Sequence, residues 1–238
     1  MNLIPNTFTR KNIFNVLLDG RPINAFESHN DPYFIIKVGP PGAGKSSSST
    51  NNEILKLGIR PDDIINIDVD KITKSFTKFR NNTYKIRKNY NNLEFNNAFF
   101  NSLTNVHKNY VRYRNKTTNK SMKDHIDFTI VSAIKQQKHI SCETTTPISQ
   151  YINNFGKMLR AKNYKIVVFF YTNRNLSNLT SRILKRGENL YLQNINPYYR
   201  AYPLKTLKNT TNALNKNLTE VIRPMHESGL IDTIIYLP

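Results

Sequence analysis

The stretch Tyr33-Phe-Ile-Ile-Lys-Val38-Gly39-Pro-Pro-Gly-Ala-Gly44-Lys45-Ser46 decides the fold of this 238-residue chain. Its first six residues are mostly β-branched or aromatic, a composition typical of a buried strand. The remaining eight match G-x-x-x-x-G-K-[ST], the phosphate-binding P-loop. A helix is expected over about 45–57, so the motif lies between a strand and a helix, which argues against a chance match. A nucleoside triphosphate is therefore the expected ligand.

Each residue type in this loop helps to hold phosphate. Glycines permit backbone angles that side chains would block, so backbone N–H groups can turn inward at the positive end of the following helix. Lys45 is expected to reach the β- and γ-phosphates, and the Ser46 hydroxyl is expected to coordinate Mg²⁺. The predicted nucleotide-binding residues are Gly39, Gly42, Ala43, Gly44, Lys45, Ser46 and Ser47.

The composition limits the class of protein. A chain of this length is expected to form one domain, 1–238, with a lead-in over 1–30 and an elaboration over 71–123. There is no apolar run of about 18 residues to predict a membrane span, and no signal-peptide pattern, so a cytoplasmic protein is expected. The single cysteine, Cys142, fits a reducing compartment. The five scattered histidines show no metal-ligand spacing, so no structural zinc is expected.

Strands and helices alternate along the chain. Helices are predicted after the P-loop and over about 148–162, 175–187 and 205–228. Strands are predicted over about 33–38, 64–68, 139–142, 165–171 and 233–237. This order predicts an α/β fold with a mostly parallel sheet flanked by helices, carrying a basic helical insertion.

The segment 71–123 carries much of the positive charge. The chain has 35 Lys and Arg against 16 Asp and Glu, a formal net charge of +19. Between Lys74 and Lys123 there are twelve basic residues, one acid (Glu94) and nine aromatic residues. Basic grooves with aromatic platforms suit single-stranded nucleic acid. Because no nucleic-acid motif is present, we favour the alternative of a helical elaboration with aromatic side chains inward and solvated Lys and Arg.

Candidate residues for the acceptor side follow the second and third predicted strands. Phosphoryl transfer needs a group that takes the acceptor's proton and cations that stabilise the transferring group. Ile67-Asp68-Val69-Asp70 ends the second strand and Cys142-Glu143-Thr144-Thr145 ends the third, at the edge where open α/β sheets bind ligands. Beyond the fourth strand come Arg182, Lys185, Arg186 and Arg200. Each residue alone is ordinary, but their order predicts a kinase.

The order P-loop, I-D-x-D, E-x-T and paired arginines resembles that of the zeta toxin kinases. The stretches Met158-Leu-Arg-Ala-Lys-Asn-Tyr164 and His226-Glu-Ser-Gly-Leu-Ile-Asp-Thr-Ile-Ile-Tyr236 also look like that family. The resemblance covers about 33–237 and implies the P-loop kinase fold. It further implies transfer of the γ-phosphate of ATP or GTP, with Mg²⁺, to a hydroxyl of a small acceptor. In that family the acceptor is UDP-N-acetylglucosamine, phosphorylated at the 3′-hydroxyl of its sugar.

The resemblance implies a role for each matching position in catalysis. Asp70, the second Asp of I-D-x-D, matches the base that accepts the proton of the sugar hydroxyl. Lys45 belongs to the phosphate machinery, and Arg186 and Arg200 match two arginines that embrace the phosphates during transfer. Arg186 needs a one-residue gap in the alignment, so Arg182 is its rival.

The resemblance also implies an acceptor site, with two departures from the family pattern. Glu143 and Thr145 match residues that hold the acceptor sugar, and Asp127 matches an acid near the substrate. Thr144 stands where the family commonly has Gly, and Pro147 stands where it commonly has Arg. Without that arginine, a contact to the acceptor's diphosphate would be lost. The nucleotide-sugar substrate is therefore the weaker part of the expectation.

Two other functions fit the same motifs. A polynucleotide 5′-hydroxyl kinase also uses a P-loop, an Asp after the second strand and lid arginines, and it would bind nucleic acid through 71–123. A nucleic-acid-associated basic protein with a repurposed kinase fold is the non-enzymatic alternative. The expected partners are a nucleoside triphosphate and a small-molecule acceptor, with no membrane partner. The sequence does not determine an inhibitory protein partner.

Overall fold

The computed structural model describes residues 10–69, 122–145, 148–173, 175–192 and 204–238, together with positions 72, 81–82, 85, 102 and 105. Most of the expected basic insertion over 71–123, including its predicted helical character, therefore lies outside the described residues. None of the described helices is long and apolar enough to cross a membrane.

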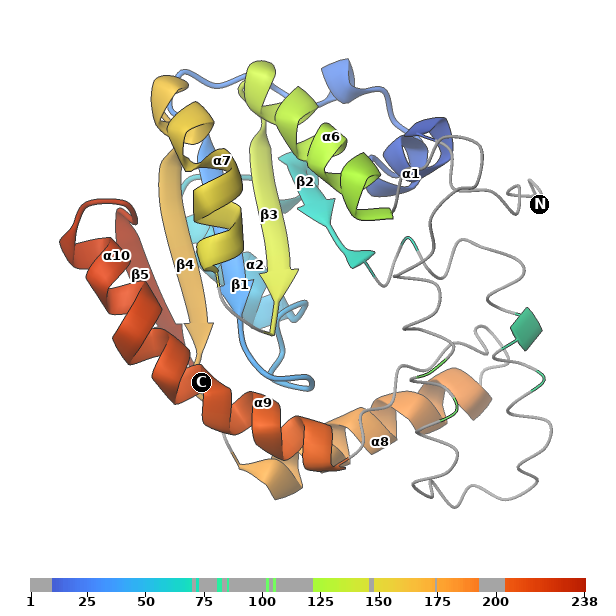
Figure 1. The fold of residues 1–238 in the computed structure, drawn as a ribbon. Helices are drawn as coiled ribbons and strands as arrows, with labels where there is room; N and C mark the ends of the chain where they lie inside the picture. The colour runs from blue at the N-terminus through green and yellow to red at the C-terminus, as the bar shows by residue number, and fades with distance from the viewer. Residues whose placement is uncertain are drawn as a thin grey trace.

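Five strands form one sheet in the order β2-β3-β1-β4-β5, and every neighbouring pair is parallel (Figure 1). Three of them have the predicted bounds, β2 ends one residue earlier than predicted, and β3 runs two residues further. The predicted α/β fold with a parallel sheet is confirmed. The strands are β1 (Tyr33–Val38), β2 (Ile64–Ile67), β3 (His139–Thr144), β4 (Lys165–Tyr171) and β5 (Thr233–Leu237).

Helices connect the strands and cover both faces of the sheet. The two helices flanking β4 lie where predicted, although the second is longer than expected. The helix after the P-loop begins at Ser48, three residues later than predicted, because the loop itself extends to Ser47. The α-helices are α1 (Arg10–Leu17), α2 (Ser48–Lys56), α6 (Met122–Lys135), α7 (Ser149–Ala161), α8 (Leu176–Leu192), α9 (Leu204–Asn217) and α10 (Arg223–Glu227), with short turns η1 (Ile23–Ala25) and η2 (Pro61–Asp63).

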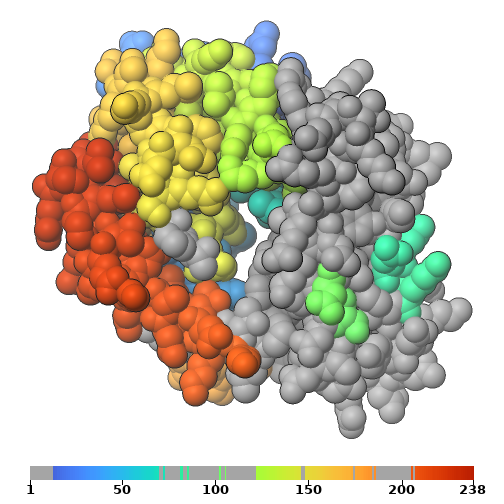
Figure 2. All heavy atoms as spheres, in the orientation of Figure 1, coloured from blue at the N-terminus to red at the C-terminus, as the bar shows by residue number. Residues whose placement is uncertain are grey.

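Alternate side chains of β1 enter two different cores. Phe34, Ile36 and Val38 of β1 pack in a core with α1, α6 and α7. Ile35, between them, packs in a core with α2 and α8 on the opposite face. Figure 1 shows α6 and α7 in front of the sheet with α2 behind it, and Figure 2 shows the same two helices side by side over the near face. The molecule is thus a three-layer sandwich of helices, sheet and helices.

The predicted helix over 205–228 is interrupted by a π-helical turn, η3 (Leu218–Ile222), between α9 and α10. Pro224, at the start of α10, has no N–H to donate to the turn before it, and a proline ring also crowds that turn. π-Helices are rare and occur mostly as single turns inside α-helices, as here. The buried stripe continues through α9 and η3, with Leu207, Leu214, Leu218 and Ile222.

Candidate active site

The P-loop lies at the topological switch point of the sheet. The chain leaving β1 runs to β2 on one side, whereas the chain leaving β3 runs to β4 on the other side. Since β1 and β3 are neighbours, their connections diverge and leave a crevice at their carboxyl ends, where open α/β sheets bind ligands. The P-loop follows β1 and Glu143 is the penultimate residue of β3, so both candidate motifs border this crevice.

The glycines of the loop are required by its conformation and by its neighbours. Gly42 and Gly44 have φ angles of +79° and +93°, in the region that favours glycine. A Cβ on Gly42 would lie 2.9 Å from the Leu179 carbonyl oxygen of α8. A Cβ on Gly39 would lie 2.7 Å from Cβ of Tyr171 on β4. The loop is therefore held tightly between its own backbone turns, the end of β4 and α8.

Polar contacts fix the loop further. The Lys45 ammonium donates to the carbonyl oxygens of Gly39 (2.8 Å) and Pro40 (3.0 Å). The Thr50 hydroxyl, buried in the first turns of α2, donates to the Gly44 carbonyl at 3.1 Å and also bonds the Tyr171 hydroxyl. Burial raises the pKa of Tyr171 to about 12, so it stays a neutral hydroxyl. These contacts tie the loop to β4 and α2.

The nucleotide side and the acceptor side of the predicted site meet at Ser46 and Glu143. The Ser46 hydroxyl donates to Glu143 Oε1 at 2.9 Å. The ammonium group of Lys37, on β1, lies 3.8 Å from the same carboxylate oxygen. Parallel pairing sets Lys37 beside Glu143, so both side chains leave the sheet on the α2 face.

A cavity of about 180 Å³ opens at this place, between the ends of β1, β2 and β3 and the helix α2. Two carboxylates, one ammonium group, two hydroxyls and two amides face it. The Ser141 hydroxyl is buried and has no hydrogen-bond partner among the described residues. The lining residues are Lys37, Ser46, Asn51, Ile54, Pro61, Ile64, Asn66, Ile67, Asp68, Ser141 and Glu143.

The remaining predicted site residues are placed in different ways. Thr145 directly follows β3 and is half-buried. Asp127 lies on α6, forms an ion pair with Lys123, and is not among the residues that line the cavity. Arg186 lies within α8, but its side chain is outside the described part of the structure, and Asp70 and Arg200 lie outside the described residues. The rival position Arg182 is exposed on α8.

Lys37 is a site residue that the sequence reasoning missed. We interpreted the run over 33–38 simply as a buried strand. The available signal was a lysine inside such a strand, since lysine is almost never fully buried without a partner. In the structure Lys37 is only 5% exposed. Burial lowers the pKa of its ammonium group, and the nearby Glu143 and Asp68 carboxylates oppose that shift.

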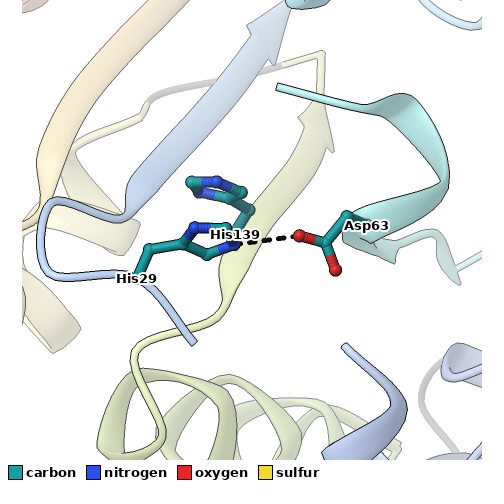
Figure 3. Close-up of side chains that lie close together, drawn as sticks. All are labelled: His29, Asp63 and His139. Atoms are coloured by element: carbon teal, nitrogen blue, oxygen red, sulfur yellow. Dashed lines mark hydrogen bonds and ion pairs between the residues drawn. The ribbon is translucent and has the colours of Figure 1, made fainter. Parts of the chain in front are cut away.

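A second polar cluster, formed by His29, Asp63 and His139, lies at the opposite, amino-terminal end of the sheet. Figure 3 shows the two imidazole rings one over the other, with the His29 ring pointing toward Asp63. The ring centroids are 3.8 Å apart, and His29 Nε2 lies 2.9 Å from Asp63 Oδ2. The structure thus brings together histidines that show no metal-ligand spacing in sequence, because β3 and the chain before β1 are neighbours only in the fold.

This cluster fits a hydrogen-bonded clasp better than a metal site. The Tyr33 backbone N–H donates to His139 Nδ1 at 3.0 Å, so in the neutral ring the hydrogen is on Nε2 and no lone pair is left there. A metal-bound histidine shows the opposite arrangement, donating its second ring N–H to an acceptor. The pKa of His139 is lowered to about 4 by burial and by the neighbouring His29. The cluster therefore joins the chain before β1 to β2 and β3.

The fold and the site together define the class. A parallel sheet of order β2-β3-β1-β4-β5, with a P-loop after β1 at the switch point, is the architecture of a P-loop nucleotide-binding α/β protein.

A solved structure shares this fold. It is a chain from work on the PezAT chromosomal toxin–antitoxin system of the human pathogen Streptococcus pneumoniae, with a TM-score of 0.57 and 16% sequence identity. The match covers 99% of this chain and 80% of that one. PezT belongs to the zeta toxins, so the resemblance expected from the motifs is confirmed at the level of the fold. Neither a family model nor a curated protein matches the sequence.

Proposed function

We propose that this protein is a phosphotransferase of the zeta-toxin type. It transfers the γ-phosphoryl group of ATP or GTP to a hydroxyl of a small acceptor, with a nucleotide sugar as the first candidate. The proposal extends the likeness of fold to an activity, and fold alone does not fix function. Its support comes from particular residues of the site.

One contact supports the proposal most directly. Ser46 belongs to the half of the site expected to hold nucleotide, and Glu143 belongs to the half expected to hold the acceptor. Their side chains are joined by a 2.9 Å hydrogen bond. Transfer requires the donor phosphoryl group and the acceptor hydroxyl to be held together in a near-attack arrangement. The contact between Ser46 and Glu143, at the crevice of the sheet, supports the proposal that the two ligands would bind side by side.

The residues present fit a nucleotide with Mg²⁺. Gly42 and Gly44 have the positive φ angles that a phosphate-binding loop needs, and a side chain at Gly42 would clash with α8. The oxygen donors of Ser46, Asp68 and Glu143 face one cavity, and hard cations such as Mg²⁺ prefer oxygen ligands. When bound, Mg²⁺ neutralises phosphate charge in this class of reaction.

The side chains of this chain divide the remaining work. Lys45, which now bonds loop carbonyls, would exchange these for phosphate oxygens. Asp70 would take the proton of the acceptor hydroxyl, and Arg186 and Arg200 would stabilise the charge of the transferring group. Glu143, with Thr145, would orient the acceptor. Asp127 would act near the acceptor, a role that rests on the family resemblance alone.

The test is an acceptor screen with γ-labelled ATP or GTP and Mg²⁺, comparing the wild type with Asp70→Asn. The panel contains UDP-N-acetylglucosamine, related nucleotide sugars, and 5′-hydroxyl DNA and RNA oligonucleotides. We expect label on a nucleotide sugar, reduced by roughly 10²–10⁴-fold in the Asp70→Asn variant because a general base is lost. Nucleotide binding should be largely unchanged.

The matched control is Asp62→Asn, which removes an exposed carboxylate of η2 by the same chemical change. It should transfer label like the wild type. Equal transfer by wild type and Asp70→Asn would sink the assignment of the base. Label on oligonucleotides instead, with binding that weakens steeply with salt, would identify a polynucleotide kinase that uses the basic segment 71–123.

A toxic activity that an inhibitory protein partner would hold in check is part of the same proposal. The similar solved structure comes from a toxin–antitoxin system, and the likeness spans most of both chains. We therefore expect induced expression of the wild type to stop bacterial growth and expression of Asp70→Asn to permit it. Equal growth of the two cultures, with both proteins present at equal levels, would contradict a toxic role.

A further inference from the structure

The most unusual charged group of the described residues is Lys37. It lies on the central strand β1, two positions before the P-loop, and its side chain is only 6% exposed. Its ammonium group faces Glu143 Oε1 at 3.8 Å, beyond ordinary hydrogen-bond length. A buried lysine normally has close acceptors, because burying a charge without them is costly. The position of Lys37 is therefore not explained by close hydrogen bonding within the fold, and a role in the adjacent cavity is the alternative.

The surroundings of Lys37 indicate that use. It shares the cavity with the carboxylates of Asp68 and Glu143 and with the Ser46 hydroxyl. The buried Ser141 hydroxyl faces the same cavity and has no hydrogen-bond partner in the described part of the chain. Without Lys37, two negative groups would face the hydroxyl that the proposed function assigns to a divalent cation. With Lys37, a positive charge inside the protein faces these carboxylates.

We propose that Lys37 is a positioning residue whose positive charge holds Glu143 beside Ser46 and limits how tightly a divalent cation binds there. The inference rests on the proposed function in taking Ser46 as a cation ligand. A cation held moderately, rather than permanently, can arrive and leave with each nucleotide. Lys37 thus sets the cation affinity of the site without touching the cation or the nucleotide.

The variant Lys37→Met tests the charge. It removes the ammonium group but keeps an unbranched apolar side chain, and it leaves Glu143, which is 27% exposed, in contact with solvent. If the cation binds about 6 Å from the ammonium group, the loss of the repulsion between one positive charge and a divalent cation is worth about tenfold in affinity even at the dielectric constant of water. We expect Lys37→Met to bind the cation at least that much more tightly. Lys37→Arg, which keeps the charge, should resemble the wild type.

The measurement is direct binding of Mn²⁺, used as a spectroscopic substitute for Mg²⁺, by the paramagnetic resonance signal of the free ion. It is made on the full-length protein both without nucleotide and with ATP. Lys56→Met is the matched control, because Lys56 is exposed on α2, pairs with Glu53 and lies outside the cavity. It changes the net charge equally and should leave Mn²⁺ binding unchanged.

A second comparison keeps the test valid if Lys37→Met folds poorly. Glu143→Gln should weaken Mn²⁺ binding. The double variant Glu143→Gln with Lys37→Met leaves neither charge of the pair, and it should bind Mn²⁺ more tightly than Glu143→Gln alone. Unchanged or weaker Mn²⁺ binding on removing Lys37, in either background, would overturn the proposal. If the wild type does not bind ATP but Lys37→Met still tightens Mn²⁺ binding, the proposed function fails and the role of Lys37 stands.

Discussion

Two buried lysines, at opposite ends of the sheet, have opposite surroundings. Lys138, just before β3, is 4% exposed, and its ammonium group donates to the Phe26 carbonyl and to the Ser28 hydroxyl at 2.8 Å. Lys37, near the end of β1, is almost as buried, but it faces carboxylates across a cavity. The first lysine donates to two neutral oxygen acceptors. The second is surrounded by charges and space.

The difference extends to the two ends as a whole. At the amino-terminal end, His29 bonds Asp63, and His139 stacks on His29 and accepts from the Tyr33 N–H. Asp232 accepts from the Ile166 N–H at 2.6 Å. At the carboxyl-terminal end, hydroxyls and carboxylates point into a cavity. Polar groups that satisfy one another away from a cavity stabilise the fold, whereas polar groups that line a cavity are suited to a ligand. Changes at the first end should therefore alter stability, and changes at the second should alter binding.

The largest effect is expected from Gly42→Ala in the P-loop. An alanine at this position would have a positive φ angle, and its Cβ would lie 2.9 Å from the Leu179 oxygen. Backbone strain and this clash together should reduce the free energy of unfolding by about 3–4 kcal/mol. Nucleotide affinity should fall as well, because the loop must move. Gly58→Ala is the matched control: its φ angle is +77° but nothing lies within 4 Å of the new Cβ. Urea unfolding and ATP titration of both variants measure the difference, and equal losses would contradict a packing role for α8.

The next effect is a loss of stability in acid caused by His139. Its pKa is lowered from 6.5 to about 4 in the folded protein, so between these values the unfolded chain takes up a proton that the folded chain does not. Stability should therefore fall as the pH decreases from about 6.5 to 4, by as much as about 3 kcal/mol at roughly 1.4 kcal/mol per pKa unit. Above pH 6.5 the group contributes no pH dependence.

The measurement is the free energy of unfolding against pH for the wild type and His139→Asn. Asparagine can place an oxygen where Nδ1 accepts from Tyr33, but it has no proton to gain. The variant should lose the part of the pH dependence that lies between 6.5 and 4. Identical slopes for the two proteins in that range would show that His139 is not the source.

The smallest effect separates the two lysines. Lys138→Met should cost about 2 kcal/mol, because the Phe26 carbonyl and its neighbouring hydroxyl lose a charged donor. Lys37→Met should change stability by less than about 1 kcal/mol, since replacing a poorly paired buried charge with an apolar side chain is often neutral or stabilising. Thermal unfolding of the two variants under the same conditions compares them directly. A larger loss for Lys37→Met would reverse the proposed contrast between the ends of the sheet.

Most of the fold could be predicted from the sequence because its signals are local. The strands β1, β4 and β5 are β-branched and aromatic runs between polar turns, and their bounds match the predictions. The turn η3 could not be predicted from periodicity, because the buried stripe from Leu207 to Ile222 continues through it. The local signal of an irregular helix was Pro224, which follows η3.

The candidate site could be predicted in part. Ser46 and Glu143 were expected at the same edge of the sheet, since parallel strands bring their carboxyl ends to one edge. The pairing of Lys37 with Glu143 depends on the register between β1 and β3, which no local pattern contains. The same holds for His29 and His139, which are joined by the fold across more than a hundred residues. Asp70, Arg186 and Arg200 stay predictions from the family resemblance.

The close approach of Gly39 to Tyr171 has a consequence for protein engineering. The first glycine of the motif is fixed by the adjacent strand: a Cβ there would lie 2.7 Å from that of Tyr171. One glycine of the nucleotide-binding motif is thus required by the packing of two strands. A phosphate loop cut out and grafted elsewhere would need a recipient whose neighbouring strand leaves the same gap, so the transferable unit is the loop together with that strand.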